Sequence, residues 1–350
     1  MTGELLPRDK DTAAGAVDDA RPDRWGERVI RILDRPPRLS LLEYLYFAGD
    51  DRFGALGVST SRDAYTPRST GPLPKFDEAA AIYELVRMVL ANEAVPDDQR
   101  RLLAPGVTMG GARPKALLDI DGAPWIVKFS DGEAIDAPLV EHASMTLAHR
   151  AGIRTAETVP IRLVDGHAVA IKRFDRAASG RRHALSANVA LKASGEQLGY
   201  PELAQLLRRR GVVEEDVNVA QMRELFRRMV FNILIDNTDD HEKNHVLLVD
   251  DAQRYELSPA FDVLPSGQAL GYQQMRIGID EADSTLANAM SMCRSFALKK
   301  DDAVREVRRV IAAVESWREH FTACGVSRSD LGLLAEQIDR PFLKDQRQEF

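Results

Sequence analysis

The sequence has few of the features that mark secreted or membrane proteins. Its 350 residues include two cysteines, Cys293 and Cys324, which are too few for a disulfide framework and lack the paired spacing of a zinc site. No apolar run approaches the ~20 residues that a membrane-spanning helix needs. The polar start MTGELLPRDKDTAAG has no apolar core that could act as a signal peptide. We therefore expect reduced cysteines, no membrane contact and a cytoplasmic location.

The chain also has no excess of positive charge. Its formal net charge is -7 at pH 7, whereas broad nucleic-acid binding requires a basic surface. The short basic runs at 181–182 and 208–210 are typical of solvated faces. We therefore do not expect this chain alone to bind nucleic acid broadly.

Hydrophobic periodicity divides the sequence into a strand-rich part and a helical part. Residues 1–20 are polar and without a period, which predicts a flexible tail. The next part should contain helices at 76–90 and 137–150, a hairpin within 116–130 that turns at Asp121 and Gly122, and strands at 158–164 and 167–174. Beyond residue 176 the pattern is mainly helical, and its strongest apolar stripe lies at 219–235. The pattern predicts an α+β protein with a small strand-rich N-terminal lobe (21–175) and a mainly helical C-terminal lobe (176–350).

The stretch NTDDHEKNHVLLV, residues 237–249, supports two incompatible interpretations. His-Glu-Lys-Asn-His matches the H-E-x-x-H zinc-protease pattern, which needs both histidines on one face of a continuous helix. However, DNTDD is rich in residues that end helices, and HVLLVDD is typical of a strand that enters a turn. His241 and His245 would then lie on a loop, which argues against a zinc site.

The same stretch also has the spacing of a phosphoryl-transfer loop. Asp239 and Asn244 follow a buried helix, and Asp262 follows in SPAFDVLP after a strand, a turn and a second strand. Phosphoryl transfer uses a carboxylate that orients the attacking hydroxyl or accepts its proton, an amide oxygen on magnesium, and a second carboxylate that bridges metal and phosphates. We expect the hairpin to bring Asp262 back beside Asn244.

Upstream residues fit the same chemistry. Gly110 and Gly111 in MGGARPK allow backbone amides to approach phosphate oxygens. Lys128 follows in a predicted strand and could pair with those oxygens, while Glu141 on the next helix could hold Lys128 in place. An ordinary exposed helix residue is an equally simple interpretation of Glu141. The ordered set favours a kinase over a zinc protease.

With these motifs in order, the chain resembles the HipA-like serine/threonine kinases, which are toxins of bacterial toxin-antitoxin modules. The resemblance covers nearly the whole chain from Arg21. Its motifs are RPDRWGERV, DRFGALGV, GGARPK, KRFDR, RRHALS, NTDDHEKN and LSPAFDVLP.

The resemblance implies a bilobal protein-kinase-like fold that uses ATP and Mg²⁺. Asp239 would be the catalytic base, Asn244 and Asp262 the magnesium ligands, and Lys128 the phosphate-binding lysine. The remaining nucleotide contacts would come from Gly110, Gly111, Ala112, Arg113, Pro114 and Lys115 over the nucleotide, Lys172, Arg173 and Phe174 at the adenine, and His241 and Lys243 near the phosphates.

The resemblance also implies partners: a protein substrate such as an aminoacyl-tRNA synthetase, and a small helix-turn-helix antitoxin through which DNA is contacted indirectly.

Two features of the sequence depart from the family pattern. The stretch before RPDRWGE leaves no room for the family's extra β-rich N-terminal subdomain, so we expect a compact variant. Thr108 in GVTMGG stands where the family often has an autophosphorylated serine, and it could accept phosphate. The alternative function is a pseudokinase that serves as a regulatory or DNA-associated binding module.

Overall fold

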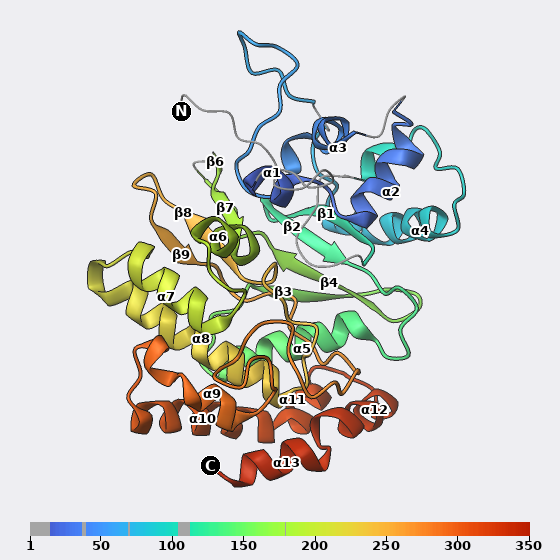
Figure 1. Ribbon diagram of the computed structural model, residues 1–350. Helices are drawn as coiled ribbons and strands as arrows, with labels where there is room; N and C mark the ends of the chain where they lie inside the picture. Colours follow the sequence, from blue (N-terminus) through green and yellow to red (C-terminus); the bar gives the residue numbers. More distant parts are fainter. Residues whose placement is uncertain (1–14, 37–39, 69–70, 104–112, 179) are drawn as a thin grey trace. The chain divides into compact units, whose positions relative to one another are not determined.

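The computed structural model describes residues 15–36, 40–68, 71–103, 113–178 and 180–350 (Figure 1). The chain forms two compact units. Met1–Asp131 and Ile161–Leu185 make up unit 1, and Gly132–Pro160 and Ser186–Phe350 make up unit 2. Each unit therefore contains two separate stretches of chain.

Unit 1 combines short helices with an antiparallel sheet. Its helices are α1 (Gly15–Ala20), α2 (Arg24–Leu33), α3 (Leu41–Phe47) and α4 (Ala79–Leu90). The sheet has the strand order β1-β2-β4-β3. Its strands are β1 (Lys115–Ile120), β2 (Ala123–Lys128), β4 (His167–Lys172) and β3 (Thr158–Arg162). Of β3, only the last two residues belong to unit 1. The short strands β5 (Arg176–Ala177), β6 (Gly180–Arg181) and β7 (His183–Ser186) follow.

Two local predictions for unit 1 are confirmed. The β1–β2 hairpin pairs Lys115 with Lys128 and turns at Asp121 and Gly122, which have φ angles of 53° and 79°. Positive φ at both central residues matches the right-handed twist of the flanking strands, so an Asp-Gly pair suits this turn. Helix α4 packs against β1 and buries four residues of the apolar stripe that predicted it, Ile82, Leu85, Val86 and Val89, while the fifth, Leu90, is half-buried.

Unit 2 is mainly helical and is organised around α8 (Val217–Leu234). This helix is buried along most of its length and packs against α7 (Tyr200–Arg210) and α10 (Lys300–Glu315), which confirms the predicted helix at 219–235. The other elements are α5 (Ala137–Arg150), α6 (Ala187–Ser194), β8 (Val246–Val249), β9 (Tyr255–Leu257), α9 (Leu286–Ser291), α11 (Trp317–Ala323), α12 (Arg328–Ile338) and α13 (Pro341–Gln348). In the described ranges, no helix is both long and apolar enough to cross a bilayer.

The units differ from the predicted boundaries at 20 and 175. Gly15–Ala20 is helical although we predicted a tail there, and residues 1–14 lie outside the described ranges. Helix α5 belongs to unit 2 because it packs against α10 and α11. Residues 176–185 belong to unit 1, where the side chains of Arg176 and Arg181 bind the carbonyl oxygen of Asp50.

Candidate active site

The loop from Asn237 to His245 connects α8 with β8 in unit 2. Helix α8 ends at Leu234, and Asp236 takes a left-handed conformation with φ of 60° that turns the chain out of the helix. His241 and His245 therefore lie on a loop, which is what we predicted and what a zinc protease does not allow. Within the described ranges, no group of three or more His, Cys, Asp or Glu side chains could hold a metal ion.

The two adjacent aspartates of this loop have different environments. Asp240 is buried, and its Oδ2 accepts hydrogen bonds from the Tyr200 hydroxyl and from Nε2 of His245, the latter at 2.9 Å. Asp239 is exposed. Of the two carboxylates, only that of Asp239 is therefore accessible from the surface.

Asn244 has the property expected of a metal ligand. Its side chain is buried, with 5% of the residue's surface exposed, and among the described residues its Oδ1 has no hydrogen-bond partner. A buried amide oxygen without a donor costs free energy, so such an atom calls for an explanation. Magnesium takes oxygen ligands of this kind, and the residue present here fits that ion.

The segment that carries Asp262 is tied to the Asp239 loop at both ends. At one end, β8 and β9 form an antiparallel hairpin, and the Ser258 amide donates to the Val246 carbonyl at 2.8 Å. At the other end, Ser266 binds the carbonyl oxygen of Asp236 through its amide at 3.1 Å and through its hydroxyl at 3.0 Å. The Thr238 amide also donates to the Ser266 hydroxyl at 3.3 Å. The segments 236–246 and 258–266 are thus joined at both ends. In the sequence, Asp239 and Asn244 lie between the bonded positions of the first segment, and Asp262 lies between those of the second.

Ser266 and Arg340 were not predicted as site residues. Arg340 donates through Nη2 to Oδ1 of Asp236 at 2.6 Å. Burial raises the pKa of the Asp236 carboxyl, and Arg340 acts in the opposite direction. Neither residue stands in a recognisable motif, because both act through contacts with residues far away in the sequence.

In unit 1, the predicted nucleotide-binding lysines occupy neighbouring strands. Lys128 on β2 is buried and pairs in register with Lys115 on β1, and residues opposite each other in such a pair share one face of the sheet. The Lys115 ammonium contacts the Asp23 carboxylate at the N-terminus of α2. Its side chain therefore takes part in the packing of unit 1, and its predicted contact with the nucleotide stays a prediction.

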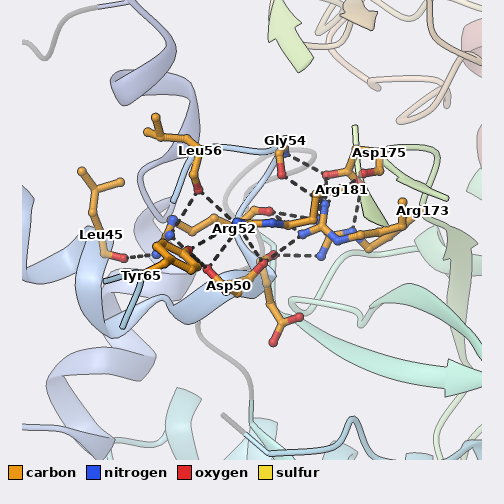
Figure 2. Close-up of polar contacts among 11 residues, drawn as sticks. Leu45, Asp50, Arg52, Gly54, Leu56, Tyr65, Arg173, Asp175 and Arg181 are labelled. Carbon is orange, nitrogen blue, oxygen red and sulfur yellow. Dashed lines mark hydrogen bonds and ion pairs between the residues drawn. The ribbon is translucent and has the colours of Figure 1, made fainter. Parts of the chain in front are cut away.

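Arg173 likewise has internal partners (Figure 2). It donates to both oxygens of Asp175, at 2.9 and 2.7 Å, and to the carbonyl oxygens of Asp51 and Arg52. Although burial by itself would raise the pKa of the Asp175 carboxyl, Arg173 holds it below its ordinary value. The Arg173 side chain is thus bound within unit 1, and the predicted adenine contact of the segment 172–174 stays a prediction.

The other predicted residues are placed as follows. Lys172 is exposed, with Nζ 5.6 Å from the centre of the Trp125 ring, and Phe174 is half-buried. Glu141 is fully buried on α5 in unit 2, so it is not an ordinary exposed helix residue. His241 is half-buried, Lys243 is exposed, Arg113 is half-buried and Pro114 is buried. Thr108, Gly110, Gly111 and Ala112 lie outside the described residues.

Comparison with known proteins identifies similar sequences and a similar fold. Residues 107–318 match the family model of the HipA-like C-terminal domain. The Sinorhizobium fredii protein named "Putative kinase Y4dM" is 28% identical over 290 residues, which cover 77% of this chain and 63% of that protein. The chain thus spans less than two thirds of the length of this relative.

A solved structure extends the likeness to the fold. A chain in the complex of HipA, HipB and operator DNA from Shewanella oneidensis MR-1 matches with a TM-score of 0.64 and 17% identity. The match covers 99% of this chain and 83% of that chain. At this identity, the likeness shows a shared fold of mixed helix and strand.

Proposed function

Because this chain belongs to the HipA-like C-terminal domain family, we propose that it is an ATP- and magnesium-dependent protein kinase that acts on serine or threonine. The proposal rests on two segments that are joined by the bond between Val246 and Ser258 and by the bonds between Asp236 and Ser266. The sequence between the bonded positions contains one exposed carboxylate, one buried amide oxygen for which the described residues provide no donor, and a second carboxylate. Phosphoryl transfer requires this set of groups.

Each residue has a definite task in the proposed mechanism. Asp239 accepts or orients the proton of the attacking hydroxyl, for which its exposure is necessary. Asn244 and Asp262 would hold Mg²⁺, which neutralises negative charge on the phosphates. Lys128 keeps the role of phosphate-binding lysine that the family resemblance implies. Nucleotide binding by the segment that begins at Gly110 remains part of the proposal.

The proposed partners follow from the family and from the net charge. The similar Shewanella chain was solved with HipB and operator DNA, so we propose that this chain is a toxin that binds a small helix-turn-helix antitoxin. Because the net charge is -7, DNA would be contacted mainly by that partner. The protein substrate would be a component such as an aminoacyl-tRNA synthetase.

The test is transfer of labelled phosphate from ATP to proteins of a cell lysate. We expect Asp239→Ala to lower transfer by roughly two to four orders of magnitude, the usual contribution of a positioned general base, with nucleotide affinity nearly unchanged. Glu242→Ala is the matched control, because Glu242 is a half-exposed carboxylate of the same loop. It should have little effect.

Other outcomes would contradict the proposal. If wild-type protein binds ATP but transfers no phosphate, the chain is a binding module. If Glu242→Ala abolishes an activity that Asp239→Ala retains, and the purified protein carries zinc by elemental analysis, the zinc-protease interpretation is restored.

A further inference from the structure

Five buried side chains form a continuous hydrogen-bond chain that joins the Asp239 loop to α7 and α8. Asn237 Nδ2 donates to Asn232 Oδ1 at 3.1 Å, and Asn232 Nδ2 donates to the Tyr200 hydroxyl at 3.1 Å. Tyr200 donates to Asp240, whose Oδ2 also lies 2.9 Å from Nε2 of His245. None of these residues exposes more than 4% of its surface.

The direction of each bond follows from the chemistry of the groups. The Asp240 carboxylate only accepts, so the Tyr200 hydroxyl and Nε2 of His245 must both donate to it. The Tyr200 oxygen can then accept from Asn232, and Asn232 from Asn237. Burial raises the pKa of the Tyr200 hydroxyl well above its ordinary value, so that it keeps its hydrogen. Asp240 is therefore the common acceptor at which the bonds from both sides end.

The members of this network lie at informative places. Asn237, Asp240 and His245 are the beginning, the middle and the end of the loop, whereas Tyr200 and Asn232 belong to α7 and α8, which pack against each other. The rings of Tyr200 and His245 also meet edge to face, with centroids 5.0 Å apart. Asn237 and Asp240 are thus hydrogen-bonded to this helix pair, and His245 contacts it through its ring.

The two residues with proposed chemical tasks are direct neighbours of these attachment points. Asp239 precedes Asp240, and Asn244 precedes His245. Fixing the side chain of one residue restricts the backbone of the next, because the two share a planar peptide bond. Groups that act on a substrate must be held close to the productive geometry, and supporting side chains commonly provide that rigidity.

We propose that Tyr200, Asp240 and His245 are positioning residues for phosphoryl transfer, which set the places of Asp239 and Asn244 without touching substrate or metal. This inference rests on the proposed kinase function. It assigns a role in the reaction to Tyr200, which lies on α7 and 39 positions before Asp239 in the sequence.

Tyr200→Phe in the full chain tests the proposal, because it removes only the hydroxyl. We expect kcat to fall by roughly 10- to 100-fold, the scale of a misplacement of about 1 Å, and the apparent KM for Mg²⁺ to rise because Asn244 shifts. Tyr44→Phe is the matched control, since the hydroxyl of that buried tyrosine in unit 1 accepts a bond from Arg31. It should leave kcat and the Mg²⁺ dependence unchanged.

A second pair of variants separates positioning from folding. His245→Gln keeps a side-chain N–H donor, whereas His245→Leu of similar size does not, so the glutamine variant should retain more transfer and a lower KM for Mg²⁺. If the role of His245 were purely structural, both variants would have a lower thermal midpoint and a smaller active fraction, but their KM for Mg²⁺ would be unchanged. That result would overturn the proposal.

Two measurements do not depend on turnover. Hydrogen exchange of peptides that cover residues 237–245 should become faster in Tyr200→Phe, and Mg²⁺ should increase the affinity for a non-hydrolysable ATP analogue less than in wild type. If wild-type protein transfers no phosphate, the kinase proposal fails, but these two readouts still decide whether Tyr200 holds the loop. Wild-type exchange and wild-type Mg²⁺ dependence in Tyr200→Phe would refute the role of the network.

Discussion

At the residue scale, the adjacent aspartates show that side chains of one type can have opposite environments. Asp240 is buried and bonded to Tyr200 and His245, while Asp239 is exposed. A buried carboxylate that already accepts two hydrogen bonds is stabilised in place and has no route to a substrate. Of the two, we therefore propose only Asp239 as the base.

Asn244 provides the residue-scale prediction. Asn244→Ala should raise the apparent KM for Mg²⁺ by at least about tenfold, the lower range seen for changes around metal ligands. It should not lower the thermal midpoint through a lost hydrogen bond, because among the described residues nothing donates to Asn244 Oδ1. Asn244→Asp keeps an oxygen ligand and is the control. Unchanged Mg²⁺ dependence in the alanine variant would exclude Asn244 as a ligand.

At the element scale, a neutral histidine takes part in the contact between α5 and α11. The Arg150 side chain lies 3.0 Å from Nδ1 of His320 and can only donate, so Nδ1 accepts. Nε2 then carries the hydrogen and faces the Thr146 hydroxyl at 2.9 Å. Burial, and secondly the charge of Arg150, lower the pKa of His320.

This arrangement predicts a loss of stability in weak acid. The unfolded imidazole has a pKa of about 6.5, above that of the folded state, so between the two values the unfolded chain binds more protons. Stability is therefore fully present above about pH 6.5 and falls as the pH is lowered towards the folded pKa. Thermal midpoints at pH 7.5 and 5.5 should differ less in His320→Gln than in wild type. An equal difference in both proteins would show that His320 does not contribute.

At the scale of whole units, Asp175 joins two distant stretches of unit 1 (Figure 2). Its carboxylate accepts from Arg173, Arg176 and the Gly54 amide, and the same arginines bind carbonyl oxygens of residues 50–54. Removing one partner of a buried ion pair leaves the other charges without compensation, which is more costly than losing a surface pair.

We therefore expect Asp175→Ala to destabilise the chain by about 3–5 kcal/mol. Denaturant unfolding measures the change, with the exposed turn residue Asp165 as the control in Asp165→Ala. A cost below about 1 kcal/mol, which is the range of surface pairs, would show that the arginines find other partners.

Much of the local structure was predictable because it depends on nearby residues. The Asp-Gly turn, the buried faces of α4 and α8, and the break at Asp236 all follow from side-chain periodicity and backbone preference. The ordered motifs also led to the family that the chain belongs to. The proposed roles of Asp239, Asn244 and Asp262 still await the tests described above.

By itself, then, the sequence determined the types of the local elements, the family and a short set of candidate residues. The tertiary structure alone decided which aspartate is exposed, that Arg173 is bound to Asp175, that Ser266 joins two loops and that α5 belongs to unit 2. Only the tertiary structure shows that the Tyr200 hydroxyl donates a hydrogen bond to Asp240. The physical reason is that these outcomes depend on burial and on hydrogen bonds between residues far apart in the chain, which no local pattern encodes.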